Sequence, residues 1–353
     1  MTAARFQRLQ RWSGWSAWIG WAALLVWAIL AWFAPGAAGP AYRFAAFACF
    51  QPALGCLIFS LIYRLTGGQW GEALEIFLSA GIRLLPWIWP LVALLVFFPA
   101  ARPEPAALGL PHSNLPSRET LLIRALVYEL VFIGLREVAL RKRARRFAGP
   151  GLILLVFTLH FLAADWFFVL DPQWYSSGFP LVWMSVAAVA GLGWSIALAS
   201  AAGRDPAASG SSGRPLGLDW GDLILATVIF SSYVAFVQFL IIWSGNLPRE
   251  IAWYVRRDGG FWRGVVIGLV LFYLAFPAAF MLFRGLKKSR RGVPGVAWLL
   301  FGMQAMWAGW FILPAFADRG PLFPVLCAVA LVAGVGLFAN RYLAVVLRLE
   351  QIQ

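Results

Sequence analysis

The sequence predicts an all-α polytopic membrane protein with about ten transmembrane helices. Two observations lead to this fold class. Of the 353 residues, 61% are apolar and only 12% are charged, whereas soluble domains carry about 25% charged residues. The apolar residues also fall into separate runs of roughly 20, the length that an α-helix needs to cross a hydrocarbon core of about 30 Å. The chain therefore has the composition and the segment lengths of a protein that folds in a bilayer.

Ten apolar runs follow one another along the chain. They cover residues 16–34, 42–63, 84–101, 119–139, 150–170, 179–200, 221–243, 261–283, 294–313 and 322–345. The first run is longer than the core of a secretory signal, so we expect it to be a retained helix. A shorter stretch, residues 68–83, places Trp70, Leu74, Phe77 and Leu78 on one helical face. It predicts an amphipathic helix at the membrane surface before the third span.

One linker divides the chain. Residues 202–217, AGRDPAASGSSGRPLG, are rich in Gly, Ser, Ala and Pro and have low complexity, as flexible linkers do. We expect residues 1–201 to hold helices one to six together with the interfacial helix 68–83. Residues 218–353 then hold helices seven to ten. The linker itself should lie in the cytoplasm.

The basic residues predict the orientation. With the N-terminus inside, 20 of the 29 Lys and Arg residues fall on the inner side, including the cluster RKRARR at 141–146. Cytoplasmic loops carry such an excess of basic residues, so both termini are predicted to be cytoplasmic. The net charge of +14 is thus spread over short loops as topology signals. This distribution argues against nucleic acid as a partner.

The metal-binding residue types are few. Cys49, Cys56 and Cys327 lie in apolar runs without ligand spacing and are interpreted as packing residues. His112 and His160 are the only histidines, too few for two haems with bis-His ligation. No phosphate-binding glycine motif occurs. If this chain handles electrons, we expect it to carry no metal centre of its own.

Charged residues within predicted spans mark candidate sites, because such residues are costly in hydrocarbon. Arg124 on the fourth span and Asp165 on the fifth lie at similar depths, roughly 8 Å below the outer end at 1.5 Å per residue. A short loop joins these spans, so we expect them to be antiparallel neighbours and predict an Arg124–Asp165 ion pair. The pair could carry function or only fix packing.

Other polar residues lie deeper or on other faces. Glu129 lies roughly 15 Å from the outer end at the same rise, where desolvation favours a protonated carboxyl; it is a candidate proton carrier or quinol contact. Arg136 shares its face and could pair with it. His160 lies on a different face from Asp165 and is either functional or a satisfied core residue. On the seventh span, Thr227, Ser231, Gln238 and Gly245 form a stripe that either packs helices or lines a path.

Two stretches resemble a known family. They are AADWFFVLDPQWYSSGF, residues 163–179, and YVAFVQFLIIWSGNLPREIAWY, residues 233–254. Both are similar to signatures of the ActF subunit of alternative complex III, a bacterial quinol:cytochrome c oxidoreductase, and weaker agreement extends over residues 66–313. The chain differs from the family at Gln173, where the family has His, at Asp171, where it has Glu, and at Arg249, where it has an acid.

The resemblance implies an NrfD-like fold of two four-helix bundles with peripheral first and last helices, in the bacterial inner membrane. It implies partners in a complex: a homologous ActC-like subunit, an iron-sulfur subunit and multihaem cytochrome c subunits, with a terminal oxidase as a further candidate. Haems and iron-sulfur clusters would lie only in these partners. A quinone or quinol is the one cofactor that this subunit itself could contact.

The polar residues within the spans and the two motifs together give candidate residues for a subunit of this kind. A proton path or quinone site would run through Arg124, Tyr128, Glu129, His160 and Asp165 in one bundle and Tyr233, Gln238 and Glu250 in the other. Both motifs fall in predicted outer loops, where partners would dock on Asp171, Trp174, Tyr175, Trp243, Asn246, Trp253 and Tyr254. The alternative for these outer residues is an aromatic belt with helix-ending turns.

Two other function classes fit the same composition. A stand-alone, proton-coupled secondary transporter would use Glu129 and Asp165 near the middle of the membrane. A structural membrane anchor would use none of the polar residues. Isolation of the protein with or without haem-rich partners separates these classes from a subunit of a respiratory complex.

Overall fold

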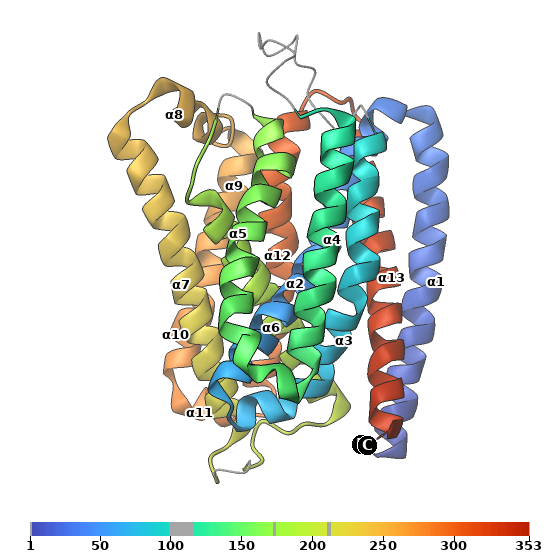
Figure 1. Cartoon of the computed structure of the whole chain (residues 1–353), viewed down its shortest axis with the longest axis vertical. Coiled ribbons are helices and arrows are strands. Elements are labelled where there is room, and N and C mark those ends of the chain that lie inside the picture. The colour runs from blue at the N-terminus through green and yellow to red at the C-terminus, as the bar shows by residue number, and fades with distance from the viewer. Residues whose placement is uncertain (1, 99–115, 172–173, 210–212, 353) are drawn as a thin grey trace.

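The computed structural model describes residues 2–98, 116–171, 174–209 and 213–352. Within these ranges every regular element is helical, and nine helices are long and apolar enough to cross a membrane. The structure thus confirms the predicted class, an all-α polytopic membrane protein. The predicted fourth span is a helix that runs beside the others (Figure 1) but is not one of the nine. Its interior carries Arg124, Glu129 and Arg136, which lower its hydropathy.

The long helices follow the predicted apolar runs, most of them extended at one or both ends. They are α1 (Ala3–Phe33), α2 (Pro35–Thr66), α3 (Gln69–Ala93), α4 (Arg118–Leu140), α5 (Ala148–Trp166), α6 (Phe179–Ala202), α7 (Leu216–Gly245), α12 (Gly292–Ile312) and α13 (Phe323–Ile352). The predicted eighth span is α9 (Gly260–Gly268), a π-helical turn (Leu269–Ala275) and α10 (Phe276–Leu282) in sequence. Short helices α8 (Pro248–Val255) and α11 (Arg284–Lys288) flank it, and 3-10 turns cover Leu94–Phe97, Lys142–Phe147, Phe168–Leu170 and Leu313–Phe316.

The predicted interfacial helix is wrong as a separate element. Residues 68–83 and the start of the predicted third span form the single helix α3. Leu74, Phe77 and Leu78 are buried, and Trp70 packs edge-on against Tyr63 of α2 at 5.5 Å. The apolar face thus packs against protein, because α2 covers it. The end of the predicted span, 99–101, lies outside the described residues.

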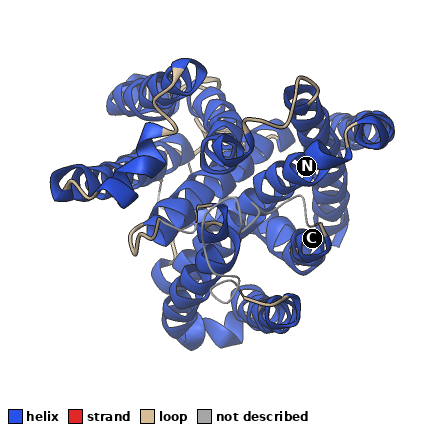
Figure 2. Cartoon of the chain, turned by 90° about the horizontal axis from the view of Figure 1, so that it is seen from above, coloured by secondary structure: helices blue, strands red, loops and turns tan. Residues whose placement is uncertain are grey.

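The helices form two bundles around α2 and α6, which are the most buried spans. The first bundle packs α3, α4 and α5 around α2, and the second packs α7, the α9–α10 segment and α12 beside α6. Figure 2 shows the helices from above, most of them close to end-on. Helices α1 and α13 pack mainly against each other at the edge of the molecule (Figure 1). The expected peripheral first and last helices are therefore present.

Two glycines bring the bundles to backbone contact. A Cβ atom added to Gly55 of α2 would lie 1.9 Å from the carbonyl oxygen of Ala187 on α6. One added to Gly191 would lie 2.4 Å from the backbone nitrogen of Cys56. Small residues allow such close approach between membrane helices. Glycine at both positions is therefore what allows the two central helices to pack at this distance.

The two ends of the molecule differ. Both termini lie at the end that also holds the linker and α11 (Figure 1). Contacts join these segments: Arg5 donates to the carbonyl of Gly203 at 3.2 Å, and Arg204 pairs with Glu350 at 3.3 Å. Helix α8 lies at the opposite end. Assignment of the terminal end to the cytoplasm stays a prediction that the basic residues carry.

Candidate functional site

The first polar cluster joins α4 to α5. Arg124 Nη1 lies 2.5 Å from Asp165 Oδ1, and the Tyr128 hydroxyl donates to Asp165 Oδ2 at 2.6 Å. Arg124 and Tyr128 are four residues apart, so they lie on one face of α4. The Asp165 side chain is 2% exposed, whereas that of Arg124 is 49% exposed. The predicted ion pair is confirmed, and Tyr128 completes a three-residue cluster.

Aromatic rings close the protein side of this cluster. Trp89 of α3 lies edge-on to Tyr128 and to Trp166, with ring centroids 5.8 and 6.0 Å apart. Its indole donates to the carbonyl of Ala125 at 2.9 Å. The buried Arg43 donates to the carbonyl of Trp166 at 2.6 Å. Among the described residues, the half-exposed Arg124 lies on one side of the Asp165 carboxylate, and Trp89 and Trp166 pack beside its partners on the other.

Sequence reasoning missed Arg43 and Trp89. Arg43 follows the start of the second apolar run by one residue, which was a usable signal because arginine is rare within a span. Trp89 gave no signal, since tryptophans are common near helix ends.

Glu129, Arg136 and His160 make no hydrogen bond or ion pair with Asp165 in the described part of the chain. Glu129 is half-buried, and within the described residues its Oε2 atom is buried without a hydrogen bond. Arg136 pairs with Glu137 at 3.6 Å, so the predicted Glu129–Arg136 pair is not formed. His160 Nε2 lies 3.2 Å from the Tyr175 hydroxyl. The histidine thus bonds to the loop that follows α5 and is separate from the Asp165 cluster.

The second bundle holds a buried hydroxyl chain. Ser185 of α6 donates to the Ser231 hydroxyl of α7 at 3.0 Å, and Ser231 lies 2.8 Å from the Tyr273 hydroxyl. Tyr273 belongs to the π-helical turn. Ser185 and Tyr273 were missed, because one sequence does not reveal which helices face each other.

The residues of the predicted stripe on α7 do not share one environment. Ser231 and Gln238 are buried, but Thr227 donates to the Leu223 carbonyl of its own helix at 2.7 Å. Tyr233 is 63% exposed on the lipid-facing side. It therefore does not share a route with the two buried residues.

The two outer motifs pack against each other. Trp174 and Trp253 stack with centroids 4.5 Å apart and planes at 12°, and both are buried. Asp171 is buried as well, and Arg256 lies 3.2 Å from its Oδ1. Burial raises the pKa of Asp171 above its usual value, although Arg256 and Arg257 partly oppose this shift. These three predicted docking residues are therefore not available at the surface, because each motif covers the other.

The remaining docking candidates are at least partly accessible. Tyr175 is 57% and Trp243 66% exposed. Asn246 is exposed and has a φ of 48°, the left-handed conformation that ends α7. Glu250 and Tyr254 are half-buried. Gln173 and His112 lie outside the described residues.

Arg257 is the main outer residue that sequence reasoning missed. Its buried guanidinium donates to the carbonyls of Trp253, Trp310 and Phe311 at 2.7, 2.9 and 3.0 Å. It also lies 3.7 Å from the Trp253 ring centroid. Burial lowers the pKa of Arg257 to about 9, so it is a cation at neutral pH. It thereby satisfies carbonyls at the end of α12, which helix geometry leaves without partners.

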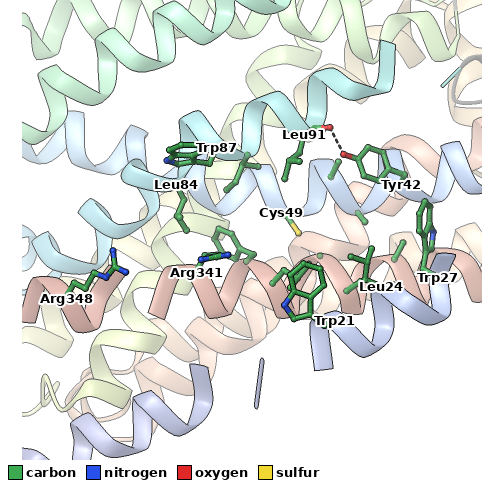
Figure 3. A pocket seen from close by; sticks show the side chains of 18 residues that line it. Trp21, Leu24, Trp27, Tyr42, Cys49, Leu84, Trp87, Leu91, Arg341 and Arg348 are labelled. Atoms are coloured by element: carbon green, nitrogen blue, oxygen red, sulfur yellow. Dashed lines mark hydrogen bonds between the residues drawn. The ribbon is translucent and has the colours of Figure 1, made fainter. Parts of the chain in front are cut away.

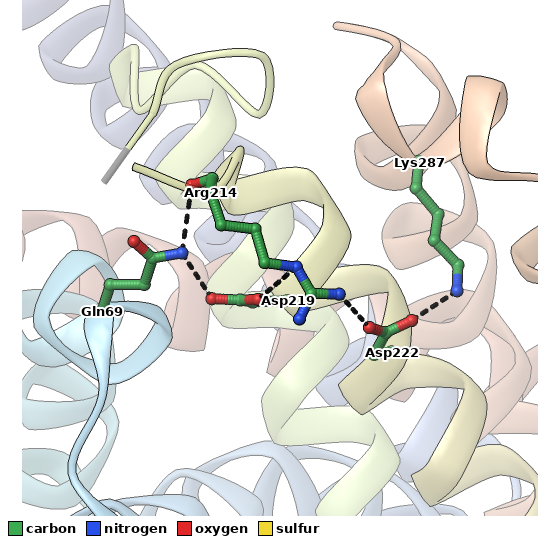
Figure 4. Close-up of polar contacts among 5 residues, drawn as sticks. All are labelled: Gln69, Arg214, Asp219, Asp222 and Lys287. Atoms are coloured by element: carbon green, nitrogen blue, oxygen red, sulfur yellow. Dashed lines mark hydrogen bonds and ion pairs between the residues drawn. The ribbon is translucent and has the colours of Figure 1, made fainter. Parts of the chain in front are cut away.

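A further polar cluster lies at the terminal end of the molecule (Figure 4). Arg214 of the linker pairs with Asp219 at 3.3 Å and Asp222 at 2.6 Å. Lys287 of α11 reaches Asp222 at 2.5 Å, and Gln69 of α3 donates to Asp219 at 2.6 Å. These contacts attach the end of the linker to three helices. They give the cluster a structural role in holding the start of α7.

The fold and the composition define a polytopic membrane protein. In the described ranges, no group of three or more His, Cys, Asp or Glu side chains is placed to hold a metal ion. A scan against protein-family models gives no match, and a search of curated proteins finds no similar chain. Any finer assignment therefore depends on the site geometry and on the sequence motifs.

Proposed function

We propose that this chain is a membrane subunit of a bacterial quinol-oxidising respiratory complex, similar to the ActF subunit of alternative complex III. In this role it is a scaffold in the inner membrane that docks periplasmic redox subunits. Electrons pass through partner haems and iron-sulfur clusters. The chain adds a proton half-channel or a quinone pocket at Asp165.

The observation that carries the proposal is the Asp165 cluster. A carboxylate in a span is costly, and it is retained where it serves a path or a partner. Asp165 is bound by Arg124 at 2.5 Å and by Tyr128 at 2.6 Å, and about half of the Arg124 side chain is exposed at the surface. In this proposal a proton reaches the carboxylate from the half-exposed side of α4, past Arg124. Asp165 also belongs to the first of the two family-like motifs.

The outer end supports docking through fewer residues than the sequence predicts. Tyr175 and Trp243 are exposed, and exposed aromatic side chains are frequent anchors at protein interfaces. The buried Trp174–Trp253 stack holds the two motifs in one unit behind them. Docking in this proposal uses Tyr175 and Trp243, with Glu250 as a hydrogen-bond acceptor at the margin.

Isolation from native membranes tests this function. An affinity-tagged chain should copurify with c-type haem, detected by absorption of the reduced sample, and with quinol:cytochrome c reductase activity. Combined alanine substitution of Tyr175 and Trp243 should weaken retention of the haem subunits. The matched control is Phe157→Ala with Phe161→Ala, which removes two exposed aromatic rings from α5.

Isolation as a solitary chain would contradict the proposal. In that case the purified protein can be placed in proteoliposomes under a proton gradient. Substrate-coupled proton movement would identify a secondary transporter. A silent, solitary chain would indicate a structural anchor.

A further inference from the structure

A long apolar cavity lies between α1, α13 and the first bundle, beside the direct contacts of α13 with α2 and α3. Its volume is about 800 Å³, and its walls come from α1, α2, α3 and α13. Figure 3 shows Trp27 and Tyr42 toward one end and Arg341 and Arg348 toward the other. The cavity lies away from the Asp165 cluster and shares none of its residues.

Charge in the cavity is confined to one end. Arg341 and Arg348 are seven residues apart on α13, which places them on the same helical face about 10 Å apart along the axis. Both are exposed. Neither has a hydrogen-bond or ion-pair partner in the part of the chain that the structure describes. At the far end, the Tyr42 hydroxyl is already used, because it donates to the Leu91 carbonyl at 2.6 Å.

The cavity and the arginines together extend beyond the depth of one leaflet. From Arg341 to Ala330, which lines the apolar part, the helix rises about 17 Å at 1.5 Å per residue. Half of a hydrocarbon core is about 15 Å. Ala330 is seven residues from the start of α13, and the lining residues of α1, α2 and α3 also lie in the halves of those helices away from the terminal end. A chain that begins at the arginines therefore passes the middle of the helices before it fills the apolar part. The arginine end is the end that the basic residues assign to the cytoplasm.

We propose that this cavity binds an anionic phospholipid of the inner leaflet. The phosphate group contacts Arg341 and Arg348, and the acyl chains fill the apolar part between α1, α3 and α13. Guanidinium groups bind phosphate through charge-assisted hydrogen bonds. Basic pockets between helices on the cytoplasmic side are typical sites for anionic lipid head groups. The lipid occupies the space between α1, α13 and the first bundle, and this inference does not depend on the proposed function.

Native mass spectrometry of the detergent-purified chain tests the proposal. The added probes are dioleoyl phosphatidylglycerol and dioleoyl phosphatidylcholine, which share acyl chains and differ in charge. We expect phosphatidylglycerol to bind more tightly. Combined Arg341→Gln and Arg348→Gln should weaken its binding by about 5-fold for each arginine.

Two further variants make the test specific. Arg143→Gln with Arg284→Gln removes the same charge from exposed residues at the same end and should leave binding unchanged. Ala46→Phe fills the apolar wall and should reduce binding while both arginines remain. Circular dichroism and elution volume confirm that each variant is folded.

Three results would overturn the proposal. The first is equal affinity for the two probes, and the second is equal loss of binding in the two double variants. The third is tighter binding of a neutral isoprenoid quinone that the arginine substitutions leave unchanged. The indole N–H of Trp27 has no hydrogen-bond partner within the described residues and would then donate to the quinone carbonyl.

Discussion

Asp165 is the residue where burial and charge conflict most directly in the first bundle. Its carboxylate is nearly inaccessible and depends on Arg124 and Tyr128 for compensation. Removal of one partner of a buried ion pair costs more than the pair contributes, because the other charge is left exposed to a medium of low dielectric constant. If Asp165 is the partner removed, the cost is smaller, because the Arg124 side chain is half-exposed.

Asp165→Asn keeps the shape of the side chain and removes its charge. If Asp165 carries protons, quinol turnover of the intact complex should fall by about 100-fold or more, the scale of general acid–base contributions. Turnover with a soluble quinol measures the change, and the haem content of the purified complex checks assembly. Tyr128→Phe removes one hydrogen bond worth about 1 kcal/mol and keeps the carboxylate, so it separates the loss of that bond from the loss of the charge. Normal turnover in Asp165→Asn would leave the cluster only a packing role.

Asp171 predicts how the stability of the protein changes with pH. Its pKa in the folded protein is raised above the usual 3.8, mainly by burial. The folded state therefore holds the proton more tightly than the unfolded state, and stability decreases as pH rises from about 4 through the raised pKa. Asp171→Asn removes this dependence. The melting temperature of the variant minus that of the wild type should increase between about pH 4 and pH 7. A constant difference over that range would refute the assignment.

At the scale of elements, Arg257 connects α8 to the end of α12. Arg257→Lys keeps the positive charge but replaces a planar group that reaches three carbonyls with a single ammonium. We expect a loss of about 2 kcal/mol or more in the free energy of unfolding, because buried carbonyls are left without partners. Thermal unfolding in detergent measures it. Arg256→Lys is the neighbouring control, since its single contact is partly exposed and should change stability by less than about 1 kcal/mol.

The elements also show what one sequence can and cannot predict. Arg124 and Asp165 were paired correctly because helix rise places both at one depth on neighbouring spans. The continuity of α3 was missed because an amphipathic face looks the same whether lipid or α2 covers it. Trp174 and Trp253 resemble interfacial anchors when each motif is considered alone, and their stacking depends on how the bundles pack. Prediction of the Ser185–Ser231–Tyr273 hydrogen-bond chain likewise requires knowledge of which helices face each other.

At the scale of the molecule, α1 is held mainly by α13. A Cβ atom added to Gly20 would lie 2.8 Å from the backbone nitrogen of Leu337, whereas nothing lies within 4 Å of one added to Gly14. Gly20→Ala should therefore destabilise this pair by about 1–3 kcal/mol. Gly14→Ala, on the same helix, should be neutral or stabilising by about 0.5–1 kcal/mol. Limited proteolysis of α1 distinguishes the variants, and equal behaviour would show that the pair tolerates separation.

The contact between Gly55 and the α6 backbone restricts how the molecule can move. Alternating access requires one bundle to rock against the other around a central site, and rocking needs side chains that can repack as the interface slides. Here the backbones of α2 and α6 meet directly, with no side chain between them at Gly55 and Gly191. Motion between the bundles would have to break this backbone contact. Gly55 and Gly191 therefore tie the two bundles together at their centre, which argues against rocking of one bundle on the other.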